Sequence, residues 1–109
     1  MDRTQLLKGV LDLAVLAVLA AEDGYGYDIV RRLRESGLDG IGDASVYGTL
    51  RRLFHSGLLT SYVKPSDEGP NRKYYALNDA GRDQLEVAAK DWRRFAETVD
   101  HLLPERLAA

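Results

Sequence analysis

Basic side chains gather in the middle of this sequence, where their spacing suits the binding of phosphate groups. Residues 45–78 hold five Lys or Arg and two Asp or Glu, although the whole chain has a net charge of −2. Arg51 and Arg52 are neighbours in one segment, and Arg72 and Lys73 are neighbours in another. Guanidinium and ammonium groups bind phosphate oxygens, and an arginine also pairs with the edge of guanine. The pattern therefore favours a nucleic acid as the partner of this segment. The net negative charge of the whole chain, in contrast, does not favour nucleic-acid binding by the protein as a whole.

Other common kinds of site lack the residues they need. The chain has no cysteine, which excludes disulfides, thiol catalysis and cysteine-held metals. Its two histidines, His55 and His101, lie far apart in the sequence, so we expect no metal site. No catalytic triad, carboxylate pair or phosphate-binding loop is visible, so we expect neither an enzyme nor a cofactor. The longest apolar run, Leu13–Ala21, is too short to span a bilayer, so we expect a cytoplasmic protein without a membrane segment.

Three helices are predicted in the first half of the chain. Apolar residues surround most of a helix over residues 6–19, and such a helix must be covered on more than one side. A chain of this length has little of its own to cover it with, which indicates a partner subunit. A second helix is predicted over Tyr25–Ser36, and a third begins at Asp43 or Ala44, with Asp43 as its N-cap. The glycine-containing connection between these two is typical of a helix-turn-helix.

A β-hairpin and a long helix are predicted to follow. Leu58–Lys64 and Arg72–Leu77 favour extended structure and flank a turn-rich tip over Pro65–Asn71. The last helix is predicted over Asp79–Leu103, with Asn78 as its cap. Its apolar residues recur at intervals of three and four, which indicates a dimer seam too short for an independent coiled coil. We expect the seam to pack against the first helix of a second subunit. The seam consists of Leu85, Ala88, Trp92, Phe95, Val99 and Leu102.

This order of elements predicts a mostly α fold with a small β-hairpin, in the α+β class. A hairpin directly after a helix-turn-helix is the wing of a winged helix, a fold in which a helix enters the major groove of DNA. We expect a winged helix-turn-helix domain at residues 1–78 and a long C-terminal dimerisation helix at residues 79–109. The third helix presents a possible DNA-contacting face opposite its apolar stripe: Ala44, Ser45, Gly48, Thr49, Arg51, Arg52 and His55. The alternative is a solvated helix face without a partner.

Four pieces of sequence occur in a specific order with specific gaps: Leu6–Gly9, Gly24–Ile29, Ala44–Leu53 with Gly57–Leu59 after it, and Gly69–Gly81. Together they resemble the PadR family of transcriptional regulators. No single piece is specific, but the four in this order are, and the resemblance extends over about residues 5–103. The single C-terminal helix is similar to that of the short subfamily, in which one such helix forms the dimer.

The resemblance implies a winged-helix homodimer that binds double-stranded DNA at a pseudo-palindromic operator, usually as a repressor. The family commonly has proline after the tyrosine of the third helix, whereas this chain has Gly48. Carried over by position, the resemblance implies that the third helix faces DNA with Ser45, Tyr47, Thr49 and Arg52. It also implies that Lys8 of the first helix meets backbone phosphate, and that Arg72 and Lys73 of the wing do the same.

Trp92 has the place of a tryptophan that lines a pocket at the dimer interface in similar multidrug-responsive members. The resemblance thus implies a small, flat, apolar effector beside Trp92, with Phe95, Leu11 and Val15 as neighbours. The alternative is that Trp92 only anchors the interface. For the protein as a whole, the alternative is a winged helix used as a protein-interaction module without DNA contact. A steep salt dependence of DNA binding separates the regulator from that module.

Overall fold

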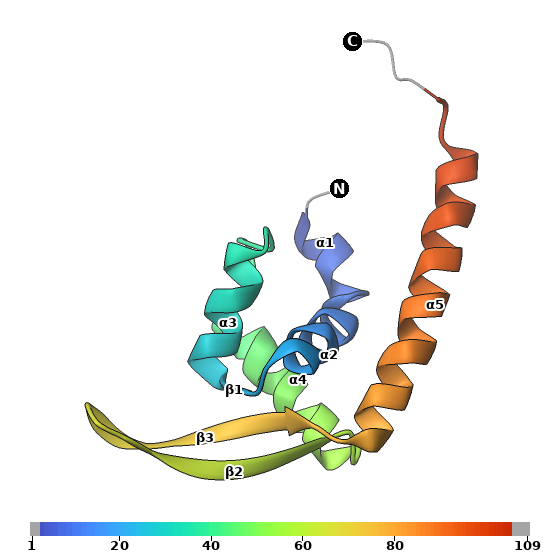
Figure 1. Cartoon of the computed structure of the whole chain (residues 1–109). Helices are drawn as coiled ribbons and strands as arrows, with labels where there is room; N and C mark the ends of the chain where they lie inside the picture. Colours follow the sequence, from blue (N-terminus) through green and yellow to red (C-terminus); the bar gives the residue numbers. More distant parts are fainter. Residues whose placement is uncertain (1–2, 106–109) are drawn as a thin grey trace.

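The computed structural model describes residues 3–105 and has the predicted winged-helix architecture (Figure 1). The helices are α1 (Arg3–Lys8), α2 (Leu11–Ala21), α3 (Gly26–Glu35), α4 (Asp43–His55) and α5 (Asp79–Leu102). The strands are β1 (Gly24–Tyr25), β2 (Leu59–Ser66) and β3 (Gly69–Leu77). The β2–β3 hairpin, which forms the wing, and α5 extend in different directions from a common base. The mostly α fold with a small hairpin and a long C-terminal helix is confirmed.

The hydrophobic core lies among the first four helices and the base of the wing. The apolar stripe predicted for α4 is fully buried, since Val46, Leu50 and Leu53 are each at most 3% exposed. α5 adds only Leu85, which packs against the edge of this core. The core side chains form one cluster: Leu7, Val15, Leu16, Leu19, Ile29, Val30, Leu33, Ile41, Val46, Leu50, Leu53, Leu59 and Leu77. Most of α5 is therefore left outside the core of its own chain.

The N-terminal apolar stretch forms two helices, so the prediction of one continuous helix over residues 6–19 is wrong. α1 ends at Lys8 and α2 begins at Leu11. Gly9 lowers the stability of a helix interior, and the Val10 amide turns back to donate to the Leu7 carbonyl at 3.0 Å. No helix within residues 3–105 is both long and apolar enough to cross a membrane.

β1 is a strand that the sequence pattern does not reveal, because two residues are too few to show an alternation. The strand order is β1-β3-β2, and both pairings are antiparallel. The wing is also longer than predicted, since β2 continues to Ser66 and β3 begins at Gly69. An irregularity in the register between Lys64 and Ser66 accommodates Pro65, which has no amide proton to donate.

Of the two predicted N-caps, one is confirmed and one is wrong. The Asn78 side chain accepts a hydrogen bond from the Gly81 amide at 2.8 Å and so caps α5. Asp43 is the first residue of α4, and Gly42 occupies the cap position without a side-chain hydrogen bond. The Asp43 carboxylate instead accepts a hydrogen bond from Arg34 at 2.9 Å. This ion pair holds the carboxylate toward α3 and away from the amides at the start of α4.

Gly81 is the point at which α5 meets the base of the wing. A methyl group at this position would collide with the Leu58 carbonyl oxygen and lie 2.6 Å from Leu77 Cδ1. We expect Gly81→Ala to lower the free energy of unfolding by about 3 kcal/mol, because a backbone carbonyl must move. Chemical denaturation measures the change. Gly48→Ala is the matched helical control, since a methyl group there meets no atom within 4 Å. Similar losses for both variants would contradict this packing.

Candidate nucleic-acid interface

A groove separates α4 and the N-terminus of α3 from the wing. Its volume is about 410 Å³, and tyrosines and basic residues form most of its walls. Four side chains predicted to contact DNA meet here, although they come from separate segments: Tyr47 and Arg51 of α4, and Arg72 and Lys73 of β3. Among the residues described, the acidic side chains are absent from this lining. The groove is therefore a basic, aromatic surface on a chain that is acidic in total.

The outward face of α4 borders this groove. Arg51 is exposed and lines it, and Tyr47 is 38% exposed. The Tyr47 ring lies so close to Gly26 of α3 that a methyl group at Gly26 would collide with it. The next residue of α4, Gly48, has open space around it. The missing side chain at Gly48 lets another molecule approach the α4 backbone closely.

Arg72 and Lys73 point to opposite faces of the wing, as expected for adjacent residues of a strand. The Arg72 guanidinium carbon lies 4.5 Å from the centre of the Tyr25 ring. Lys73 Nζ lies 5.3 Å from the centre of the Phe54 ring and 5.4 Å from that of Tyr75. Aromatic rings orient a cation without neutralising its charge, so both groups stay available to an anion such as phosphate.

Arg52 differs from Arg51 because it is paired within the chain. Its guanidinium donates to both carboxylate oxygens of Asp12 on α2, at 2.6 and 2.8 Å. The hydrogen bonds to Asp12 raise the pKa of Arg52. Both side chains are at least half exposed, so the pair contributes only about 0.2–1 kcal/mol to stability. An external phosphate would therefore compete with Asp12 for Arg52. The sequence pattern does not reveal this pairing of Arg52 with Asp12.

Thr49 does not lie on the exposed face, so the expectation that it faces DNA is wrong. It is only 5% exposed, because its position on α4 turns it toward the core. Its hydroxyl donates to the Ser45 carbonyl oxygen at 2.8 Å, which satisfies the group within the helix. Ser45 itself is exposed, and it lines a small cavity of about 90 Å³ together with Lys8 of α1. Lys8 and Ser45 thus lie together beside the start of α4.

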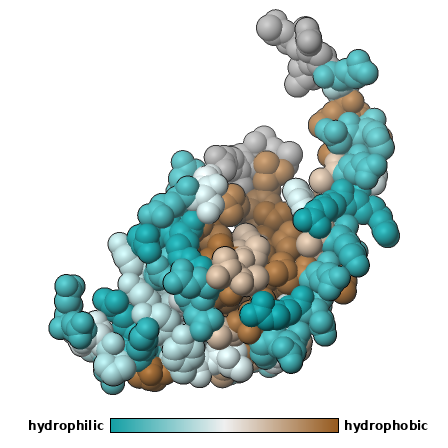
Figure 2. Space-filling model, viewed as in Figure 1, coloured by the Kyte–Doolittle hydropathy of each residue, from teal (hydrophilic) through white to brown (hydrophobic). Residues whose placement is uncertain are grey.

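The predicted seam on α5 is largely uncovered in the single chain. Trp92 is 43% exposed, Phe95 64%, Val99 38% and Leu102 80%. Figure 2 shows hydrophobic side chains gathered in the hollow between the N-terminal helices and α5, whereas the outer side of α5 is hydrophilic. Exposed apolar patches of this kind mark interaction sites in soluble proteins.

A largely apolar cavity of about 410 Å³ lies beside this seam, between α5 and the N-terminal helices. Trp92, Phe95 and Val99 line it from α5. Within the chain, Leu11 and Val15 do not line this cavity, and the burial of Val15 contradicts its expected place beside an effector. Val15 is fully buried in the core, and Leu11 lines the small cavity beside Lys8. Because the helix breaks after Lys8, the N-terminal side chains that line this cavity opposite Trp92 are those of Leu6 and Val10.

Two tyrosines that line the groove have no predicted role from the sequence pattern. Tyr25 belongs to β1, and Tyr27 is 59% exposed in the first turn of α3. Both occur in the piece Gly24–Ile29, so the alternation of glycine and tyrosine was the available signal. Glycine at position 26 makes room for the Tyr47 ring, which explains why these residue types alternate.

Comparisons with known proteins agree with this geometry. The model of the Transcriptional regulator PadR-like family matches residues 15–87. A PadR-like transcriptional regulator of Bacillus cereus is 35% identical, with a TM-score of 0.82 over 94% of this chain and 99% of that one. A PadR family transcriptional regulator of Eggerthella lenta is 32% identical, with a TM-score of 0.83 over 94% and 89%. An uncharacterised protein of Lysinibacillus sphaericus is 28% identical over 92% of this chain and 94% of its own length. The chain belongs to the PadR-like family of DNA-binding transcriptional regulators.

Proposed function

We propose that the protein is a homodimeric repressor that binds a pseudo-palindromic operator. The groove between α4 and the wing supports this function most directly, because Arg51, Arg72 and Lys73 gather there on an otherwise acidic chain. In the proposed complex α4 enters the major groove, where Arg51 reaches base edges or phosphates. The wing cations meet the adjacent backbone, and Lys8 meets the phosphates on the other side of α4.

Residues 1–78 form the DNA-binding unit in this proposal, and residues 79–109 form the dimerisation unit. The occupant of the apolar face of α5 is a second copy of the chain. A second copy would cover Trp92, Phe95 and Val99 and the exposed Leu6. Two copies related by a two-fold axis would place two α4 helices on one face of the duplex, about 34 Å apart. Such a protein acts on chromosomal DNA in the cytoplasm.

A small, flat, apolar effector is the proposed ligand of the cavity beside Trp92. The cavity is large enough for a small aromatic molecule, and its lining is mostly apolar. An effector that binds better to a dimer with another head spacing would release the operator. Trp92 is the chain's single tryptophan, so its fluorescence reports occupancy directly. Titration with anilinonaphthalene sulfonate should quench Trp92 and weaken operator binding together. Quenching with unchanged operator binding would contradict an effector role.

Selection from a pool of genomic DNA fragments at near-physiological salt tests the main proposal. The pool includes the fragment upstream of the protein's own gene. We expect retention of fragments that share one palindromic site, with an affinity that falls steeply as salt rises. Retention of no fragment by a folded dimer would contradict the proposal and favour the protein-interaction module.

The pairing of Arg52 with Asp12 leads to a prediction about affinity. Asp12→Asn should strengthen operator binding about two- to fivefold and steepen its salt dependence, because Arg52 is freed for phosphate. Fluorescence anisotropy at several salt concentrations measures both quantities. The control is Asp12→Asn combined with Arg52→Ala. Relative to Arg52→Ala alone, this double variant should show no gain in affinity. An equal gain without Arg52 would show that lost charge repulsion alone is responsible.

A further inference from the structure

The face of the sheet turned away from the core carries three tyrosines in a row, one from each strand. Tyr74 of β3 is the middle one, and it lies opposite Tyr25 in one pairing and opposite Tyr62 in the other. The Tyr25 and Tyr74 rings meet edge to face, with centres 5.4 Å apart. The Tyr62 and Tyr74 rings are stacked, with centres 5.5 Å apart and planes within 12°. These three residues, here named the tyrosine ladder, extend across the full width of the sheet.

The tyrosine ladder holds two cations of the wing. The Arg72 guanidinium lies over Tyr25, and Lys64 Nζ lies 5.4 Å from the centre of the Tyr74 ring. Lys64 and Arg72 are directly opposite each other in the β2–β3 pairing, so both point to the same face. Long basic side chains lose much conformational freedom when they bind, and a ring that orients them beforehand reduces this cost.

One hydrogen bond connects the outer strand of the wing to the body of the protein. The Tyr62 hydroxyl donates to the Asp23 carboxylate at 2.8 Å. β2 and β1 are not neighbours in the sheet, because β3 lies between them. The bond therefore passes over β3 and closes the sheet on its outer face. This hydrogen bond to the Asp23 carboxylate also raises the pKa of Tyr62.

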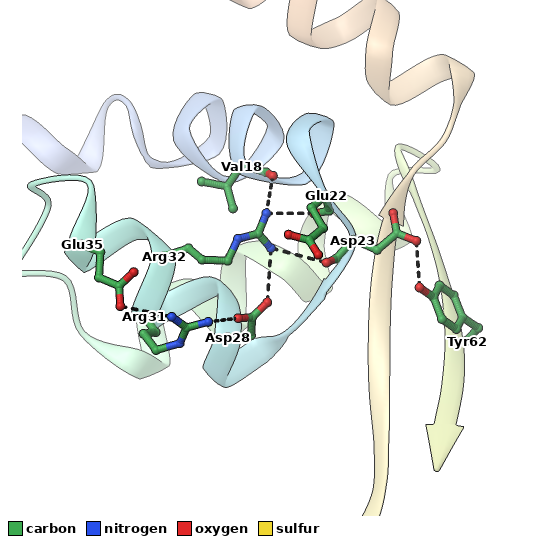
Figure 3. A network of polar contacts seen from close by, with 8 residues as sticks. All are labelled: Val18, Glu22, Asp23, Asp28, Arg31, Arg32, Glu35 and Tyr62. Carbon is green, nitrogen blue, oxygen red and sulfur yellow. Dashed lines mark hydrogen bonds and ion pairs between the residues drawn. The ribbon is translucent and has the colours of Figure 1, made fainter. Parts of the chain in front are cut away.

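Asp23 lies in the short connection between α2 and β1, which Arg32 ties to its surroundings (Figure 3). Arg32 of α3 donates to the Val18 carbonyl at 2.7 Å and to the Glu22 carbonyl at 2.9 Å, at the end of α2. Its other nitrogen donates to the Asp28 carboxylate at 3.3 Å. The Arg32 side chain is only 17% exposed, so this network lies partly within the protein. The connection that holds Asp23, the acceptor of the Tyr62 hydrogen bond, is thus fixed to both α2 and α3.

We propose that Tyr62 and Asp23 are positioning residues for DNA binding, acting together with the tyrosine ladder. They hold the wing at a fixed angle to α4, so that Arg72 and Lys64 meet the DNA backbone already oriented. This assigns Lys64 as a third cation of the wing beside Arg72 and Lys73. The inference rests on the proposed function, since it concerns how the same interface is ordered before DNA arrives.

Tyr62→Phe tests the proposal, because it removes the hydroxyl and keeps the stacked ring. We expect operator affinity to fall about three- to fivefold with an unchanged salt slope, since the same phosphates are bound by a less ordered wing. Hydrogen exchange of the β2 amides, Leu59–Ser66, should become faster. Asp23→Asn keeps an acceptor for the hydroxyl and should retain most of the affinity. Asp23→Ala should match Tyr62→Phe, and the double variant should be no worse than either.

Lys64→Ala gives the contrasting result expected for a contact residue, namely a flatter salt slope. Wild-type affinity in Tyr62→Phe would overturn the positioning role while leaving the proposed function intact, whatever the exchange rates. Additive losses in the double variant would also overturn it, because the two residues would then act separately. Absence of selective, salt-dependent binding by the wild-type protein would instead overturn the proposed function, and the positioning role with it.

Discussion

Val99→Glu should convert the protein from a dimer into a monomer and weaken operator binding about 100-fold or more. Val99 lies on the apolar face of α5, in the cavity lined by Trp92 and Phe95. In the proposed dimer this face is covered by a second copy, so the new carboxylate would lose its water without gaining a partner. A monomer offers one DNA-binding head, and it forfeits the high effective concentration of the second head. Light scattering measures the mass, and anisotropy measures the affinity.

Arg94→Glu is the matched control, because it adds a carboxylate to the exposed, hydrophilic side of α5. This variant should remain a dimer. A stable dimer of Val99→Glu would mean that α5 is not the interface. A monomer that binds the operator as tightly as the wild type would mean that dimerisation is not needed for DNA binding.

Replacement of both Arg72 and Lys73 by alanine should weaken DNA binding about 10- to 100-fold at near-physiological salt. The loss should be similar for all DNA sequences, because phosphate contacts carry no base information. The slope of log affinity against log salt should fall by about two, since each phosphate contact contributes about 0.9. Both cations are exposed and lie over aromatic rings, which do not neutralise their charges.

Lys90→Ala serves as the control for this double variant. Lys90 is exposed on α5, where it forms an ion pair with Glu86 at 3.6 Å, and it does not line the groove. Its loss should leave both affinity and salt slope nearly unchanged. An unchanged slope in the Arg72 and Lys73 variant would show that the wing does not contact phosphate.

The elements that the sequence predicts well are those defined by a local period. The buried stripe of α4, the extent of α5 and its Asn78 cap all follow from spacing and residue type over a few turns. The wing cations are likewise evident, because Arg72 and Lys73 are adjacent to a turn-rich tip. Such features depend on neighbours within the same element, which a single sequence displays.

The features that escaped prediction depend on contacts between distant residues. The pairing of Arg52 with Asp12 joins residues 40 positions apart, and that of Tyr62 with Asp23 joins residues 39 apart. The two-residue β1 exists only because β3 offers it a partner. The predicted exposure of Thr49 on the DNA-facing side of α4 is wrong for a related reason. The Thr49 hydroxyl donates a hydrogen bond to the helix backbone, so this polar side chain can be buried beside the apolar stripe.

Hydroxyl-radical footprinting of a selected genomic fragment tests the central claim most directly, namely that two copies read one operator through α4 and the wing. We predict two protected segments on one face of the duplex, with centres about 34 Å or a multiple of this apart. The protection should disappear as salt is raised, and with Val99→Glu it should be lost at concentrations that saturate the wild type. A fragment that shows no protection, or one unrepeated protected segment, would contradict the claim.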